Sequence, residues 1–187
     1  EFRRVLFRSG ASLVAHIKNT RTPFSIDFGV GDVIVPKQEK RKIPTQLDDF
    51  TSPTVNTYSL ETTIAEKLDA ILDLMEFSSR MKDYYDIYYL ANKFDFDGAT
   101  LTKALKKTFE NRGHAFTIEQ FEQVMAFAEN DAMQKKWKAF CRKIDTKTAD
   151  FNAVLKTIKE FLIEPFMATV ENKEFEEKWT TLESKWH

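Results

Sequence analysis

The sequence predicts an α+β protein in which a few strands precede a mainly helical C-terminal part. Glycine and proline number only five each among 187 residues, which argues against an all-β protein rich in tight turns. Apolar residues alternate with polar ones early in the chain, whereas later segments repeat them at the period of a helix. The 17 Phe, 5 Tyr and 3 Trp residues supply enough bulk for a sizeable core.

Charge and cysteine content exclude several classes of protein. The 28 Lys and Arg residues oppose 29 Asp and Glu, so the chain is not a globally basic nucleic-acid binder, although charges can still gather on one face. Cys141 is alone and cannot form an internal disulfide, so nothing indicates an oxidising compartment. We find no apolar run long enough to span a bilayer and no signal peptide, and therefore expect a cytoplasmic protein without membrane contact.

The first residues are set apart by their composition. Residues 1–9 read EFRRVLFRS, with three arginines but no initiator Met, helix cap or clear periodicity. The string resembles translated sequencing-adaptor DNA; the alternative is a native basic arm. We therefore treat residues 1–10 as a non-native leader, leave it out of the fold prediction, and expect an upstream part of the natural protein to be missing.

The clearest strand pattern follows this leader. In FSIDFGV (24–30) apolar residues alternate with polar residues and glycine at the period of two, and Gly31-Asp32 then interrupts the pattern before Val33–Val35. Residues 37–53 are polar and contain two prolines, which predicts a long exposed loop. A second short strand is expected over residues 55–58.

Two helices complete the first part of the chain. Ser59 can cap a helix over about residues 60–76, in which apolar residues recur at helical spacing. A second helix is expected over about residues 79–92. We therefore assign residues 11–92 to one domain that contains both strands and helices.

Residues 93–187 are expected to form a second, helical domain, because strand signals vanish there. Helical patterns recur behind expected caps at Thr100, Thr117 and Asp150. Pro165 is expected to end the penultimate helix, because proline lacks the backbone N–H that a helix interior needs.

Charged residues lie on the apolar faces of the two early helices. Asp83 shares the inward face of its helix with Ile87 and Leu90, and Asp86 lies at the edge of that face. Burying a carboxylate without a partner is strongly unfavourable, so Asp83 must be compensated. On the preceding helix Lys67 flanks the apolar stripe.

The pattern leaves two interpretations of Asp83 equally open. Asp83 can pair with Lys67 or Arg80 in a buried bridge that only holds two helices together, or the group can form a functional site. Asp27 is similarly ambiguous. On a rigid strand beside glycines its carboxylate can hold a divalent metal, but a polar residue on the solvent face of a half-buried strand is at least as common.

Three segments together carry a family resemblance: SIDFGVGD (25–32), YSLETTIAEKLDAI (58–71) and RMKDYYDIYYL (80–90). They resemble the AbiEii/AbiGii nucleotidyltransferase toxins and the related MenT group, and E-x-x-x-x-E-K followed by R-x-K-D-x-x-D is the most specific feature. FDGATLTKALKKTFENRG (96–113) and KKWKAFCRKI (135–144) are similar to the family's helical C-terminal half. The resemblance covers about residues 20–165.

The resemblance implies the C-terminal part of a polymerase-β-type nucleotidyltransferase fold, with a mixed sheet of few strands. Such proteins bind Mg²⁺ and an NTP at carboxylates and transfer a nucleotidyl group to an acceptor. By position, Asp27 would be a metal ligand or base, Lys67 would bind the triphosphate, and Asp83 would hold Lys67 or a polar group of the nucleotide. The neighbouring groups implied for nucleotide binding or support are Arg80, Asp86 and Glu61.

One part of the family pattern does not occur in this sequence. A Gly-Ser turn, followed about a dozen residues later by Asp-x-Asp, should precede Asp27 and would supply the phosphate-binding turn and two principal metal ligands. A two-metal site needs such paired carboxylates. We therefore expect the parent protein to be an enzyme and this chain alone to be inactive.

The resemblance also implies partners. The family's toxins act in bacterial toxin–antitoxin or phage abortive-infection systems, which implies a cognate antitoxin and an RNA acceptor such as tRNA. Basic clusters at 103–112 and 135–147 would then face RNA phosphates, although interspersed acids slightly favour a solvated helix face. The rival prediction is a non-catalytic helical interaction module that binds RNA or a partner protein.

Overall fold

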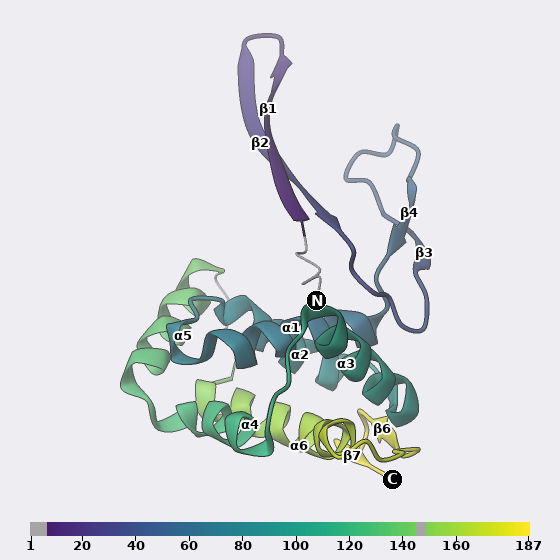
Figure 1. Ribbon diagram of the computed structural model, residues 1–187. Coiled ribbons are helices and arrows are strands. Elements are labelled where there is room, and N and C mark those ends of the chain that lie inside the picture. The colour runs from purple at the N-terminus through teal and green to yellow at the C-terminus, as the bar shows by residue number, and fades with distance from the viewer. Residues whose placement is uncertain (1–6, 145–148) are drawn as a thin grey trace.

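A computed structural model of the chain describes residues 7–144 and 149–187. Two β-hairpins project from one side of a body made of helices (Figure 1). The α+β class predicted from the sequence is confirmed. The expected non-native leader overlaps residues 1–6, which lie outside the described residues.

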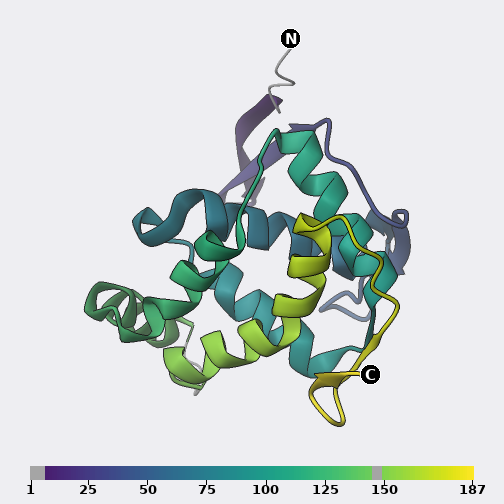
Figure 2. The same cartoon turned by 60° about the horizontal axis from the view of Figure 1, so that its bottom comes forward.

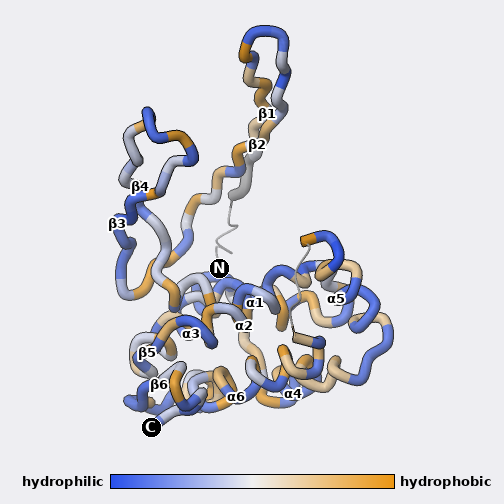
Figure 3. Tube along the Cα trace, turned by 180° about the vertical axis from the view of Figure 1, so that it is seen from behind, coloured by the Kyte–Doolittle hydropathy of each residue, from blue (hydrophilic) through white to orange (hydrophobic). Residues whose placement is uncertain are grey.

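The first hairpin consists of β1 (Phe7–Ile17) and β2 (Thr20–Val30), which pair antiparallel along their whole length. The predicted strand over 24–30 is confirmed as the second half of β2. The pairing of residues 7–17 with β2 was not predicted; its first residues belong to the leader, residues 1–10, that was left out of the fold prediction. The hairpin stands clear of the helices (Figure 3), and the large apolar side chains of β2 are exposed.

The second hairpin consists of β3 (Glu39–Lys42) and β4 (Thr54–Thr57). The expected strand over 55–58 is confirmed in β4. The prediction that 37–53 is entirely loop is wrong for β3, whose charged EKRK sequence is typical of an exposed edge strand. Within the described residues all strand pairs are antiparallel and form three separate sheets, not the mixed sheet that the resemblance implied.

Hydrogen bonds hold the start of α1 (Leu60–Leu74) to Val35, in the segment between the two hairpins. Ser59 caps the helix as predicted: its hydroxyl accepts from Thr62 N at 3.1 Å and donates to the Val35 carbonyl. The Val35 amide donates to the Thr62 hydroxyl at 2.8 Å, and that hydroxyl donates back to Val35 O at 3.0 Å. The chain leading into α1 is therefore held by backbone and side-chain hydrogen bonds.

The remaining helices pack around one apolar core (Figure 2). They are η1 (Met75–Phe77), α2 (Met81–Lys93), α3 (Gly98–Arg112), α4 (Ile118–Met125), η2 (Ala126–Glu129), α5 (Asp131–Lys143) and α6 (Phe151–Val170). The predicted caps Thr117 and Asp150 are confirmed at α4 and α6. The predicted cap Thr100 is wrong, because Asp97 caps α3 and accepts from Thr100 N at 2.8 Å. None of the helices in the described ranges is long and apolar enough to cross a membrane.

Pro165 does not end a helix as predicted but lies inside α6. A proline at this position leaves the carbonyl four residues earlier, that of Phe161, without its helical donor. The Trp186 indole fills this role and donates to Phe161 O at 2.8 Å. The helix therefore continues because a side chain from the C-terminal segment replaces the missing N–H.

The second half of the chain also contains strands, which corrects the prediction of a purely helical region. The strands β5 (Phe96–Asp97), β6 (Lys178–Thr180) and β7 (Lys185–Trp186) form a small antiparallel sheet. Gly98 lies against this segment, and a Cβ there would be 2.6 Å from the Glu177 carbonyl oxygen. Such close approach of two backbones requires glycine.

Candidate functional site

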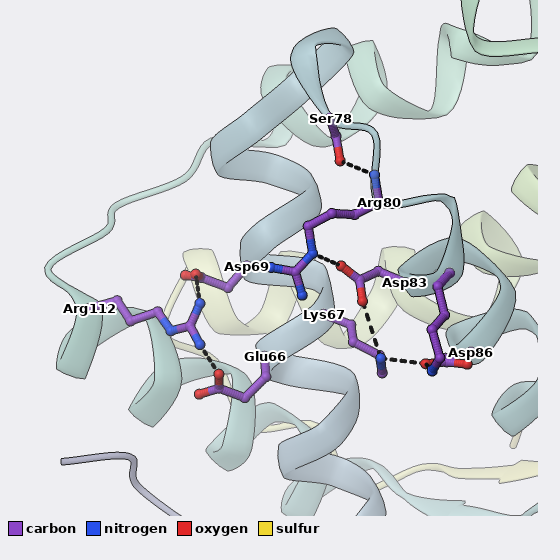
Figure 4. Close-up of polar contacts among 9 residues, drawn as sticks. Glu66, Lys67, Asp69, Ser78, Arg80, Asp83, Asp86 and Arg112 are labelled. Carbon is purple, nitrogen blue, oxygen red and sulfur yellow. Dashed lines mark hydrogen bonds and ion pairs between the residues drawn. The ribbon is translucent and has the colours of Figure 1, made fainter. Parts of the chain in front are cut away.

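Lys67 of α1 lies between two carboxylates of α2 (Figure 4). Its Nζ is 3.2 Å from Asp83 Oδ1 and 2.5 Å from Asp86 Oδ2. Arg80 Nε lies 2.5 Å from Asp83 Oδ2, and Lys82 Nζ lies 2.5 Å from Asp86 Oδ2. We call these five side chains the Lys67 cluster; its charges alternate in sign and, with three cations and two anions, sum to +1.

The packing of α1 and α2 explains how the cluster forms. Both helices bury an apolar stripe in the common core, which fixes the rotation of each helix about its axis. Asp83 lies in the first turn of α2, where the helix dipole favours a negative charge. The Ser78 hydroxyl accepts from Arg80 N at 3.0 Å and orders the entry to this turn.

Burial differs sharply within the Lys67 cluster. The side chain of Asp83 is 5% exposed, those of Lys67 and Asp86 are 17% and 19% exposed, and that of Lys82 is 71% exposed. The prediction that Asp83 faces inward and needs a cation is confirmed, and it has two cations. Its neighbour Tyr84 is buried, and burial and the Asp83 charge raise the pKa of the Tyr84 hydroxyl.

Glu61 and Asp27 are not joined to the Lys67 cluster. Glu61 lies half-buried in the first turn of α1, and among the described residues no hydrogen bond or ion pair connects it to the cluster. Asp27 is exposed on β2, opposite Gly10. The structure therefore brings together Lys67, Arg80, Asp83 and Asp86 but leaves the other two predicted site residues outside their direct contacts.

The described residues contain no preformed group of three or more metal ligands. In residues 7–144 and 149–187 no three His, Cys, Asp or Glu side chains are grouped so that they could hold a metal ion. Two carboxylates of the Lys67 cluster already neutralise cations, and Asp27 stands apart from them. Among the described residues, no two further ligands are therefore grouped with Asp27 to complete the expected Mg²⁺ site.

A second ionic cluster on α1 was missed by the sequence analysis. Arg112 Nη1 lies 2.8 Å from Asp69 Oδ2, and its other terminal nitrogen contacts Glu66. His114 Nδ1 lies 2.8 Å from Asp69 Oδ1. Asp69 is fully buried, and burial raises the pKa of its carboxyl to about 6. Figure 4 shows Arg112 with its two carboxylates on a different side of α1 from the Lys67 cluster.

Several lysines of the two basic clusters have partners inside the molecule. Lys136 donates to the carbonyls of Glu76 and Ser78 at 2.8 and 3.0 Å, which ties α5 to the segment between α1 and α2. Lys107 pairs with Glu110 at 2.8 Å. Lys147 lies outside the described residues. These contacts agree with the view that much of the basic sequence forms ordinary helix surface.

Comparison with known proteins assigns the chain to a family. A model of the family described as nucleotidyl transferase AbiEii toxin, type IV toxin–antitoxin system, matches residues 1–179. No curated protein and no solved structure matches the chain. The matched range contains both helices of the Lys67 cluster and the E-x-x-x-x-E-K and R-x-K-D-x-x-D segments on which the resemblance was noted. The chain therefore belongs to the AbiEii family of nucleotidyltransferase toxins of type IV toxin–antitoxin systems.

Proposed function

We propose that the Lys67 cluster is the triphosphate-binding part of an active site that transfers a nucleotidyl group from an NTP to RNA, such as tRNA. One observation carries this proposal. Lys67 is held by two carboxylates next to the core, yet 17% of its side chain remains exposed to solvent. Replacing a buried ion pair by apolar residues is often neutral or stabilising, so helix packing alone gives little reason to place Lys67 against the buried Asp83.

The chemistry follows from positioning and electrostatics. In phosphoryl and nucleotidyl transfer, negative charge spreads over the phosphate oxygens, and a preoriented ammonium stabilises that charge. Asp83 holds Lys67 through Oδ1 and is itself held by Arg80 through Oδ2. Asp83 can thereby keep the Lys67 ammonium in position when the triphosphate binds. Arg80 is half-exposed beside it and is the second cation that a nucleotide phosphate can reach.

The wider setting is proposed from the family. The parent protein acts in the cytoplasm of a bacterium, in toxin–antitoxin or phage defence, and a cognate antitoxin controls it. The chain alone is proposed to be inactive in transfer, because the paired Asp-x-Asp carboxylates that a two-metal site needs do not occur ahead of Asp27 in its sequence. A transfer assay with α-labelled NTP and total tRNA tests this: labelling of tRNA by this chain would contradict the proposal of inactivity.

Nucleotide binding is tested by thermal unfolding of the chain with millimolar Mg²⁺ and each of the four NTPs. A ligand that binds only the folded state stabilises it by about 2.7 kcal/mol at one hundred times its Kd, which raises the Tm by roughly 5–10 °C. Lys67→Ala is expected to abolish the shift. The matched control, Lys107→Ala, removes a surface lysine that pairs with Glu110 on its own helix and should keep the shift.

The same experiment separates the two functions. A shift that requires Lys67 supports the nucleotide site. The absence of a shift with every NTP, together with energetic coupling between Lys67 and Asp83 in a double-mutant cycle of stability, supports the interaction module, in which this pair is only a bridge between helices.

A further inference from the structure

Both carboxylates of the Lys67 cluster are paired with the Lys67 ammonium group, which a triphosphate would also have to contact. Lys67 Nζ contacts Asp83 Oδ1 at 3.2 Å and Asp86 Oδ2 at 2.5 Å. A polyanion that approaches Lys67 therefore meets two negative charges. The ammonium has three donor positions and the two carboxylates take two of them, so phosphate oxygens can contact Nζ at more than one position only if one carboxylate withdraws.

Asp83 is poorly suited to withdraw. Its side chain is 5% exposed, and each of its oxygens faces a different cation, Lys67 or Arg80. Removing one partner of a buried ion pair is strongly destabilising, because a buried charge is left uncompensated. Asp83 is therefore expected to stay paired with Lys67 while the triphosphate binds.

Asp86 has an alternative partner. Its Oδ2 is 2.5 Å from Lys67 Nζ and also 2.5 Å from Lys82 Nζ, so one oxygen is shared by two ammonium groups. Lys82 is one turn earlier on the same helix, and its side chain is 71% exposed. When Asp86 leaves Lys67 it can remain paired with Lys82 at a position where water also solvates it.

We propose that Asp86 is a displaceable carboxylate that occupies Lys67 until a triphosphate replaces it, and that Lys82 retains Asp86 after the exchange. This inference rests on the proposed function. It assigns Asp86 as a positioning residue that sets the affinity of the site, in place of the direct nucleotide contact implied by the family resemblance. The unliganded cluster thereby keeps a net charge of only +1, and binding of the polyanion has to compete with an internal anion.

The test measures the Kd of inorganic triphosphate by calorimetric titration of the chain in metal-free buffer. Asp86→Asn should tighten binding about fivefold, because the competing anion is gone while the side chain keeps its shape. Asp83→Asn should weaken binding, because Lys67 loses its anchor. The matched control Asp73→Asn makes the same charge change on α1, where Asp73 is exposed and close to His114, and should alter the Kd less than twofold.

A double-mutant cycle with Lys82 distinguishes displacement from general attraction of charge. Lys82→Ala should weaken triphosphate binding about threefold in the wild type, since Asp86 then has only Lys67 to pair with. In the Asp86→Asn background Lys82→Ala should have no effect. An equal loss in both backgrounds would show that Lys82 acts only as a nearby positive charge and would overturn the proposed exchange.

Failure of the proposed function looks different from failure of this inference. Binding that Lys67→Ala leaves unchanged, or no binding by either the wild type or Asp86→Asn, overturns the nucleotide site and the exchange with it. Binding that requires Lys67 but that Asp86→Asn leaves unchanged or weakens overturns only the exchange.

Discussion

At the scale of single residues, Lys67 connects two helices through one ammonium group. Asp83 and Asp86 both depend on it, but to different degrees, because Asp83 is the more deeply buried and Asp86 also has Lys82. Loss of the two lysines should therefore have unequal consequences for folding.

We predict that Lys67→Ala lowers the free energy of unfolding by about 2–4 kcal/mol, since it removes one cation from a buried carboxylate. Lys82→Ala removes an exposed partner of Asp86 and should cost at most about 0.5 kcal/mol. Urea denaturation of both variants measures the difference. Equal losses would show that burial of Asp83 does not govern the energetics of this cluster.

The raised pKa of the Asp69 carboxyl leads us to predict that stability depends on pH. Burial raises the pKa of its carboxyl from 3.8 to about 6 in the folded chain. The folded state thus binds this proton more tightly, so the contribution of Asp69 to stability is full below pH 4 and is lost as the pH rises through 6. This change in pKa corresponds to roughly 3 kcal/mol of the free energy of unfolding.

Urea denaturation between pH 4 and 7 tests this effect as the difference between the wild type and Asp69→Asn, in which the group does not titrate. The wild type should lose stability relative to the variant across this range. A constant difference, or one of opposite sign, would mean that Arg112 and His114 offset the burial of Asp69 more fully than the raised pKa implies.

The two buried acids show what sequence periodicity can reveal. Asp83 was predicted to be buried because it falls among apolar residues at helical spacing, and its candidate partners Lys67 and Arg80 belong to the same motif. Asp69 was missed, although it also lies among buried apolar residues of its helix. Its partners are Arg112 and His114, which lie at or just beyond the end of a helix distant in sequence, and no local pattern reports such a pairing.

At the scale of elements, Pro165 and Trp186 depend on each other. The Trp186 indole donates to Phe161 O, the carbonyl that Pro165 leaves without a helical donor. We predict that Trp186→Phe lowers the free energy of unfolding by about 1–3 kcal/mol, because it leaves a buried carbonyl unpaired.

The Pro165→Ala background provides the control for this prediction. Alanine supplies a backbone N–H to Phe161 O, so Trp186→Phe should cost measurably less there. Identical costs in both backgrounds, measured by chemical denaturation, would show that Trp186 contributes through packing and not through this hydrogen bond.

Elements were predictable where local signals agreed. The helix starting after Ser59 has both a cap and an apolar stripe, and it was placed within two residues of α1. The cap of α3 was misplaced because Asp97 and Thr100 are both suitable capping residues and three positions apart. The strands β5, β6 and β7 have at most three residues each, too few for alternation to be visible.

At the scale of the whole molecule, the first hairpin contributes little to the core. The core residues begin at Val35, and the apolar side chains of β2, including Phe24, Ile26 and Phe28, are exposed. Two-stranded hairpins are marginally stable on their own in water. The arrangement of separate hairpins could not be predicted from local patterns, which report strands but not which strands pair.

We predict that deletion of residues 1–29 leaves the helical body folded, with a Tm within about 3 °C of the full chain, because the contacts of Asn111 with Gly31 O and of Tyr58 with Asp32 are retained. Thermal unfolding monitored by circular dichroism checks this. A large loss of cooperativity or a much lower Tm would show that β1 and β2 stabilise the body through contacts of their own.

The central claim is that Lys67 binds the triphosphate of a nucleotide. The most direct measurement is the Kd of the NTP that gives the largest thermal shift, determined by calorimetric titration of the wild type and Lys67→Ala. The account predicts binding at one site in the wild type and at least about tenfold weaker binding in the variant, as expected for loss of a charge-assisted contact. Equal Kd values for the two proteins would contradict it.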